Sequence, residues 1–185
     1  MIKPTLSISI PTKDRSLIVT ENIKRLIKVS TKYNIYIYIS DGSINNETYN
    51  NYLKLKKIYK NIFYHKVPIH SGHDYNIINS IKVSKSDYVW VLGDSITIEV
   101  SFIKKILDII KKHNPSIIGV NDKDRNVKQK TGLYRNNKEV FLKFAWHLTL
   151  TGTTIYNKEI ISKYIEFDTK YYKNFPQMYL IFNTL

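Results

Sequence analysis

The chain has 185 residues, a length that allows one ordinary domain or two tightly fused halves around one core, and 43% of its residues are hydrophobic. It contains no cysteine, which excludes disulfides and thiolate metal sites and suits a reducing cytoplasm. The formal net charge of +14 favours anionic partners, whereas the first residues lack the apolar core of a signal peptide and no apolar run approaches the roughly 18 residues of a membrane span.

The first hundred residues alternate between short β-branched runs and amphipathic segments. The runs predict strands at residues 5–10, 35–40, 62–64 and 88–92. Between them, apolar residues at helical spacing predict helices in the segment after PTKDR and at residues 48–60 and 73–83. This alternation predicts an α/β fold with a mostly parallel central sheet and helices on both of its faces.

The second half continues the pattern less regularly. It predicts a helix at 100–112, a strand at 116–120, a mobile loop at 121–138, a helix at 139–148, a strand at 153–156 and a helical segment from 171 to the end. No repeat or flexible linker interrupts the chain. We therefore expect one domain over residues 1–185, with a ligand-binding half at 1–98 and a second half at 99–185.

Three polar clusters follow three of the predicted strands, and the strand ends of such sheets are where ligands bind. The first is PTKDR, in which Thr12 can donate and accept hydrogen bonds and Arg15 suits stacking or phosphate binding. The second is DGS, in which Asp41 could accept an N–H from a nucleobase. The third is GDS, in which Gly93 clears space and Asp94 could meet a divalent cation. The alternative for each cluster is a turn with a helix cap.

Four stretches in order and spacing resemble the nucleotide-binding half of family-2 inverting glycosyltransferases with the GT-A fold. They are LSISIPTKDR, YISDGS, GHDYN and DYVWVLGDS, and the similarity covers roughly residues 4 to 100 well. The subgroup that the sequence looks most like makes bacterial cell-surface polysaccharides. Larger relatives continue past the end of this chain, so part of the acceptor side is expected to be shorter here.

The resemblance assigns a role to each cluster. Residues that would bind the nucleotide sugar are Pro11, Thr12, Arg15, Asp41, Ser43, His73, Asn76 and Asp94. Asp94 would also belong to the family's acidic metal motif, which binds Mg²⁺ or Mn²⁺ at the leaving diphosphate. Here that motif has one aspartate where the family usually has two or three. The arginine that many members carry near GHDYN is missing, and His73 either replaces it or is an ordinary surface histidine.

The catalytic base is not clear from the sequence. Many members place an acidic pair where this chain has Pro176 and Gln177, and glutamine cannot remove a proton. Asp168 and His147 remain as candidates. The alternatives are a helix cap for Asp168 and a partly buried polar residue for His147.

The resemblance implies an enzyme that transfers a sugar from a uridine diphosphate sugar to a glycan or lipid-linked acceptor, in the cytoplasm or at the inner face of the membrane. Lysine patches such as KLKKIYK would then contact anionic lipid, although the amino-acid bias of an AT-rich genome explains them equally well. A basic nucleic-acid-binding module is the second hypothesis, but the usual aromatic RNA-binding strand signatures are missing and no nucleic-acid partner is expected. A third hypothesis is a degenerate glycosyltransferase fold that only binds.

Overall fold

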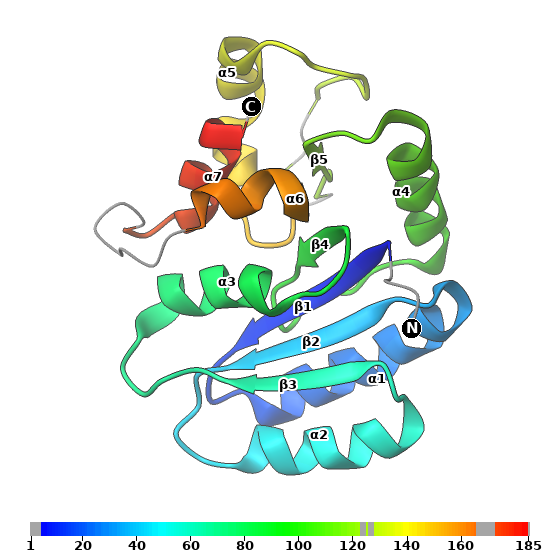
Figure 1. The fold of residues 1–185 in the computed structure, drawn as a ribbon, viewed down its shortest axis with the longest axis vertical. Helices are drawn as coiled ribbons and strands as arrows, with labels where there is room; N and C mark the ends of the chain where they lie inside the picture. The colour runs from blue at the N-terminus through cyan, green and yellow to red at the C-terminus, as the bar shows by residue number, and fades with distance from the viewer. Residues whose placement is uncertain (1–4, 123–124, 126–127, 166–172, 185) are drawn as a thin grey trace.

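The computed structural model describes residues 5–122, 125, 128–165 and 173–184, and it is built around one six-stranded sheet between two layers of helices (Figure 1). The strands are β1 (Leu6–Thr12), β2 (Tyr36–Asp41), β3 (Ile62–Lys66), β4 (Tyr88–Val91), β5 (Ile117–Gly119) and β6 (Thr154–Asn157). Their order across the sheet is β3-β2-β1-β4-β6-β5. The predicted α/β class is therefore confirmed.

The sheet is mostly parallel, as the sequence predicts. β1 pairs in parallel with both β2 and β4, and β2 pairs in parallel with β3. The exception is β6, which lies antiparallel between β4 and β5. β6, which follows both β4 and β5 in the chain, thus lies between them in the sheet, an order that alternation along the sequence does not reveal.

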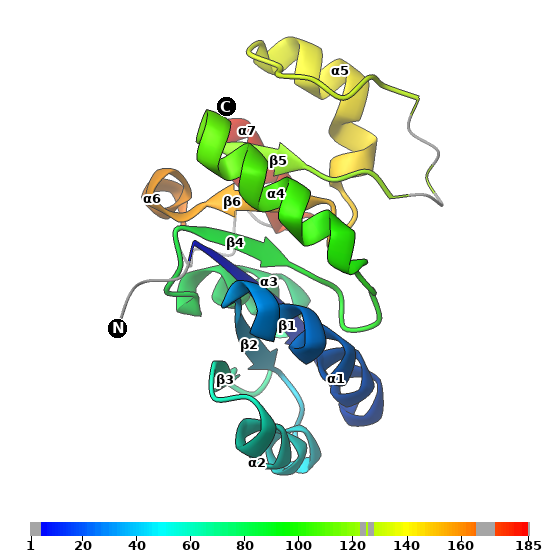
Figure 2. The same cartoon turned by 90° about the vertical axis from the view of Figure 1, so that its right-hand side faces the viewer.

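Two groups of helices cover the two faces. One face carries α1 (Ser16–Tyr33), α2 (Glu47–Ile58) and α4 (Val100–His113), which pack on one core cluster with β1, β2 and β4. The other carries α3 (Gly72–Val83), α5 (Asn137–Leu148), α6 (Lys158–Ile161) and α7 (Pro176–Thr184), and a short 3₁₀ turn, Ser162–Tyr164, follows α6. Figure 2 is viewed from this side, with α1 and α4 in front of the strands.

Alternation along β4 explains why both faces are apolar. Tyr88 and Trp90 belong to the cluster under α1 and α4, whereas Val89 and Val91 belong to the cluster under α3 and α7. Successive side chains of a strand point to opposite faces, so the apolar side chains of β4 contribute to both cores. β4 is therefore the central strand on which both cores meet.

Two boundaries that flank predicted loops differ from the sequence prediction. β1 continues through Pro11 to Thr12, two residues past the predicted end, because its pairing with β4 has already stopped at Ser9 and a proline is tolerated there. The helix after the predicted loop begins at Asn137.

In the part of the chain that the structure describes, no helix combines the length and apolarity that crossing a membrane requires.

Candidate functional site

The three polar clusters meet at one edge of the sheet. Thr12 ends β1 and lies beside Asp41, which ends β2, in the parallel register. The Thr12 hydroxyl donates a hydrogen bond to Asp94 Oδ2 at 3.0 Å, and Asp94 follows β4. Parallel strands bring their carboxyl ends to the same edge, so residues 82 positions apart in the chain come into contact.

Asp94 is bound on both of its oxygens. Its Oδ1 lies 2.6 Å from Arg15 Nη1, and its Oδ2 accepts the bond from Thr12. The Asp94 side chain is 7% exposed and that of Arg15 is 46% exposed, so the pair lies at the boundary between core and solvent. A nearly buried carboxylate is stable in such a place because both oxygens have donors and one of the donors is charged.

These residues do not fit the divalent metal that the resemblance implies. The described residues contain no group of three His, Asp or Glu side chains that could hold an ion. The one carboxylate at the end of β4 is already neutralised by Arg15. A metal would have to displace the guanidinium from Asp94, and we therefore derive no step through a metal.

Gly93 does not open the space that the sequence suggests. A Cβ at this position would lie 3.2 Å from Ile96 Cδ1, so the room beside the backbone is filled by Ile96. Asn22, which the sequence analysis missed, fixes the same turn: its Nδ2 donates to the carbonyl oxygens of Asp94 at 3.1 Å and Ile96 at 2.9 Å. The signal was present, because Asn22 is a polar residue on the apolar stripe of α1 with Val19 and Ile23.

Asp41 has no exposed surface. Its Oδ1 accepts the backbone N–H of Ser43 at 2.8 Å, and its Oδ2 accepts the Tyr64 hydroxyl at 2.8 Å. Lys66 Nζ lies 3.8 Å from the same Oδ2. Burial, and then the hydrogen bond to the Asp41 carboxylate, raise the pKa of Tyr64 above its ordinary value, so the tyrosine keeps the proton that it donates.

The first two clusters are tied to each other through Ser43. The backbone N–H of Asp14 donates to Ser43 Oγ at 2.7 Å, and Lys66 Nζ donates to the carbonyl oxygen of Ser43. Asp14 adopts a φ of 53°, in the left-handed region, so the chain turns sharply between β1 and α1. The two loops are therefore one connected rim rather than two independent turns.

Helix α3 contributes Asn76 to this rim and leaves His73 outside it. Asn76 is 5% exposed and its Nδ2 donates to the carbonyl oxygen of Thr12 at 3.0 Å. Its Oδ1 has no hydrogen-bond partner among the described residues. His73 lies exposed in the first turn of α3, one position before Asp74, whose Oδ2 accepts the backbone N–H of Asn174.

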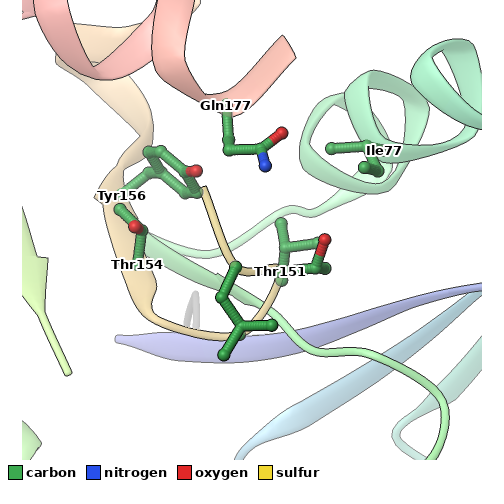
Figure 3. Close-up of a pocket in the computed structure, with 8 residues that line it drawn as sticks. Ile77, Thr151, Thr154, Tyr156 and Gln177 are labelled. Atoms are coloured by element: carbon green, nitrogen blue, oxygen red, sulfur yellow. The ribbon is translucent and has the colours of Figure 1, made fainter. Parts of the chain in front are cut away.

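A small pocket lies next to this rim, between β4, α3 and the start of α7 (Figure 3). Ile77 of α3, the neighbour of Asn76, and Val91 of β4, three positions before Asp94, contribute to its lining. The remaining lining residues are Leu150, Thr151, Gly152, Thr154, Tyr156 and Gln177. The pocket is therefore formed by both halves of the chain.

Gln177 presents an unpaired amide oxygen in this pocket. Its Nε2 donates to the carbonyl oxygen of Thr149 at 2.5 Å, which fixes the orientation of the amide because a carbonyl accepts only from the NH₂ group. The residue is 5% exposed, and its Oε1 has no hydrogen-bond partner in the part of the chain that the structure describes. An orphaned buried acceptor of this kind usually marks a place for a donor from water or a ligand.

The two candidate bases have different outcomes. His147 is 3% exposed and its Nε2 lies 2.8 Å from the carbonyl oxygen of Val120, so it could reach an acceptor only after moving. Its Nδ1 is buried and has no hydrogen-bond partner among the described residues. Asp168 lies outside the described residues.

Comparison with known proteins identifies the class of this fold and site. The α/β architecture, with polar loops at the carboxyl edge of a mostly parallel sheet, is that of the GT-A fold. Residues 7–172 match the sequence profile of Glycosyl transferase family 2, and the chain belongs to that family. No curated protein sequence matches the chain.

Three solved structures illustrate the likeness. TarS residues 1–349 from S. aureus give a TM-score of 0.68 at 16% identity, over 98% of this chain and 55% of that one. The mannosyltransferase PcManGT from Pyrobaculum calidifontis, with GDP-Man and Mn²⁺, gives a TM-score of 0.65 at 8% identity, over 94% of this chain and 51% of that one. Glucosyl-3-phosphoglycerate synthase from Mycobacterium tuberculosis, with Mn²⁺, UDP and glucosyl-3-phosphoglycerate, gives a TM-score of 0.56 at 12% identity, over 86% of this chain and 58% of that one. The chain thus spans about half the length of each of these solved chains.

Proposed function

We propose that this protein is a nucleotide-sugar-dependent, inverting glycosyltransferase. The observation that carries the proposal is the hydrogen bond from Thr12 to Asp94, which joins the ends of β1 and β4 in a member of Glycosyl transferase family 2. It supports a continuous binding edge, because Asp41 and Ser43 extend the same edge along β2.

In this proposal the nucleoside lies on the rim formed by Pro11, Asp41 and Ser43. The buried Asp41 carboxylate holds Ser43 and Tyr64 in place, and a base N–H would replace one of these donors. The diphosphate lies toward Arg15 and Asn76, the residue that α3 contributes to the rim. Uridine is the first base to test, because TarS was also solved with UDP and with UDP-GlcNAc.

The pocket at Gln177 is the proposed place for a sugar hydroxyl. The unpaired Gln177 Oε1 offers a hydrogen-bond acceptor, and Tyr156 lies in the same lining. Burial raises the pKa of Tyr156, against the opposing effect of its side-chain contact with Thr154, so its hydroxyl remains protonated. A pocket with one acceptor and one donor suits the O–H group of a glycan acceptor. Asp168 stays the proposed base, with His147 as the alternative.

Calorimetry with a panel of nucleoside diphosphates tests the proposal. Wild type should bind UDP, and Thr12→Val should weaken that binding about tenfold, because the valine cannot hold Asp94 through a hydroxyl. Thr20→Val on α1 is the matched control, since its hydroxyl bonds only to the carbonyl of Ser16. Absence of binding for UDP, GDP and ADP to wild type would overturn the proposal.

The acceptor is proposed to be lipid-linked, with α5 at the surface of an anionic membrane. Leu142 is 72% exposed and Trp146 is 58% exposed on α5, and Lys138 is exposed on the same helix. Exposed aromatic and aliphatic side chains beside lysine suit a lipid interface, where each basic residue adds about 1 kcal/mol.

Sedimentation with vesicles tests this contact. Leu142→Ser should lower the fraction bound to phosphatidylglycerol vesicles several-fold, because the leucine side chain no longer inserts. Leu53→Ser is the control, since this leucine is also exposed but lies on the lysine-rich α2. Equal loss in both variants, or no binding of wild type, would contradict a contact through α5.

A second candidate function is nucleotide binding without transfer. The observation that favours it is Gln177, an amide at the position where the family resemblance implies a carboxylate. It predicts that wild type binds UDP but releases no sugar from UDP-sugars, and that Gln177→Glu gains turnover. Transfer or donor hydrolysis by wild type would exclude it.

A further inference from the structure

The charge balance at the end of β4 differs from that of a metal site. Asp94 is the acidic residue there, and its charge is compensated within the protein by Arg15 at 2.6 Å. The other buried acid on this edge, Asp41, is compensated separately by Ser43, Tyr64 and Lys66. Neither carboxylate is left with an unsatisfied oxygen that would require a divalent ion.

Arg15 is placed to meet an anion while Asp94 holds it. It directly precedes α1, an 18-residue helix whose N-terminal dipole adds positive potential. Its guanidinium has five N–H donors in a planar fork, and 46% of the side chain remains exposed, so donors beyond the one on Asp94 are open to a ligand.

Asp94 in turn is a rigid support for that cation. Thr12 fixes one carboxylate oxygen, and Asn22 fixes the backbone of the same residue through its carbonyl oxygen. A side chain held this way loses less conformational freedom when it binds a ligand, which favours Arg15 over a flexible surface lysine. Lys13, two positions earlier, is exposed, and no ion pair joins it to another described residue.

We propose that Arg15, held by Asp94, is the resident cation that pairs with the diphosphate, so that diphosphate binding needs no divalent ion. The identity of the nucleotide rests on the proposed function, but the pairing of Arg15 with phosphate oxygens would hold for any diphosphate. Asp94 is then a positioning residue for Arg15 rather than a metal ligand.

Calorimetry in two buffers tests it, one with EDTA and one with Mn²⁺. The ligands are UDP and inorganic pyrophosphate, and the proteins are wild type, Arg15→Met, Asp94→Asn and Arg25→Met. Arg25 is exposed on the same helix, so Arg25→Met removes an equal charge away from the site. Thermal melts followed by circular dichroism confirm that each variant is folded.

The two assignments of Asp94 give opposite results. With Arg15 as the cation, wild type binds UDP equally in both buffers within about twofold, Arg15→Met binds at least about tenfold more weakly, and Arg25→Met binds like wild type. Asp94→Asn weakens binding about threefold to tenfold in both buffers, because Arg15 loses its anchor but not its charge. A tenfold gain with Mn²⁺ that disappears in Asp94→Asn would overturn the proposal.

Pyrophosphate separates this proposal from the proposed function. If wild type binds pyrophosphate through Arg15 but binds no nucleoside diphosphate, the nucleotide-sugar assignment fails and the diphosphate site stands. If UDP binds and Arg15→Met has no more effect than Arg25→Met, the site holds a nucleotide and the role of Arg15 is wrong. If neither ligand binds wild type, both proposals are wrong.

Discussion

Asn76, in the second turn of α3, donates a hydrogen bond from its side-chain amide to the backbone carbonyl oxygen of Thr12 at 3.0 Å. This bond joins a helix on one face of the sheet to the end of β1. Asn76→Ala should lower the free energy of unfolding by about 1–2 kcal/mol, because a buried hydrogen bond is lost. It should also weaken UDP binding several-fold, since Thr12 is no longer held, as denaturant unfolding and calorimetry would show.

Asn79→Ala is the control for this prediction. Asn79 lies one turn further along α3 and donates to Ser40 Oγ at 2.8 Å, within β2 rather than at its end. It should lose similar stability and keep wild-type UDP affinity. Equal loss of affinity in the two variants would show that Asn76 acts only through stability.

Tyr64→Phe tests the buried carboxylate of Asp41. The change removes the hydroxyl that donates to Asp41 Oδ2, and at pH 8 it should cost about 1–3 kcal/mol of the free energy of unfolding. Tyr49→Phe is the control, because its ring contacts that of Tyr64 but 40% of the residue is exposed. A cost for Tyr49→Phe as large as for Tyr64→Phe would contradict a specific role of the hydroxyl.

Wild type and Tyr64→Phe should also differ in how their stability depends on pH. Burial and the Asp41 carboxylate raise the pKa of Tyr64 in the folded state, whereas an unfolded tyrosine loses its proton near pH 10. Above about pH 10 the unfolded state therefore holds fewer protons, and stability falls as pH rises. Wild type should lose stability between pH 9 and 11 more steeply than Tyr64→Phe, and parallel curves would contradict this.

Gly152→Ala should destabilise the loop before β6. Gly152 has a φ of 111°, a conformation that side-chain-bearing residues rarely adopt, and an added Cβ would lie 2.6 Å from Ile96 Cδ1. Its carbonyl also accepts the indole N–H of Trp90 at 2.7 Å, which ties the loop to β4. We expect a loss of about 1–3 kcal/mol in denaturant unfolding. Gly119→Ala, whose Cβ would meet nothing closer than 3.9 Å, should change stability by less than about 1 kcal/mol.

Gln177→Met should separate the two roles of the amide. Methionine has a similar volume, but it cannot donate to the carbonyl of Thr149 or accept from a ligand. We expect about 1–2 kcal/mol lower stability, unchanged affinity for UDP, and loss of transfer to an acceptor in a coupled assay. A parallel loss of UDP affinity would place Gln177 at the nucleotide instead.

The parallel half of the fold could be predicted from local pattern. The alternating run up to Asp41 and the apolar run before Asp94 each form a buried strand; Asp41 is the last residue of its strand, and Asp94 lies three positions after the end of the other. Their convergence follows from one rule, that parallel strands end at one edge. What the sequence could not supply is which donors neutralise each acid, because the contact between Arg15 and Asp94 depends on the path of the turn at Asp14.

The second half was less predictable because its partners are distant in the chain. β5 is three residues long and half exposed, so its sequence pattern alone does not reveal that it joins the sheet by pairing with β6. Asn22 was overlooked because a polar residue on an apolar stripe indicates burial but does not identify its partners, and its two backbone acceptors lie more than 70 residues away. Gln177 was visible as a departure from the family, but its unpaired oxygen required the structure.

The strand β6, which pairs with both β4 and β5, is synthesised after both of them. Thr12, Asp41, Asn76 and Asp94 have all left the ribosome before the strand that covers the free edge of β4, which begins at Thr154. Until then β4 is an edge strand with an apolar surface, and β5 has no strand to join. A nascent chain that ends before Thr154 therefore exposes an unpaired apolar edge strand that is prone to aggregate. Its dependence on chaperones should peak while the ribosome translates the segment between β5 and β6.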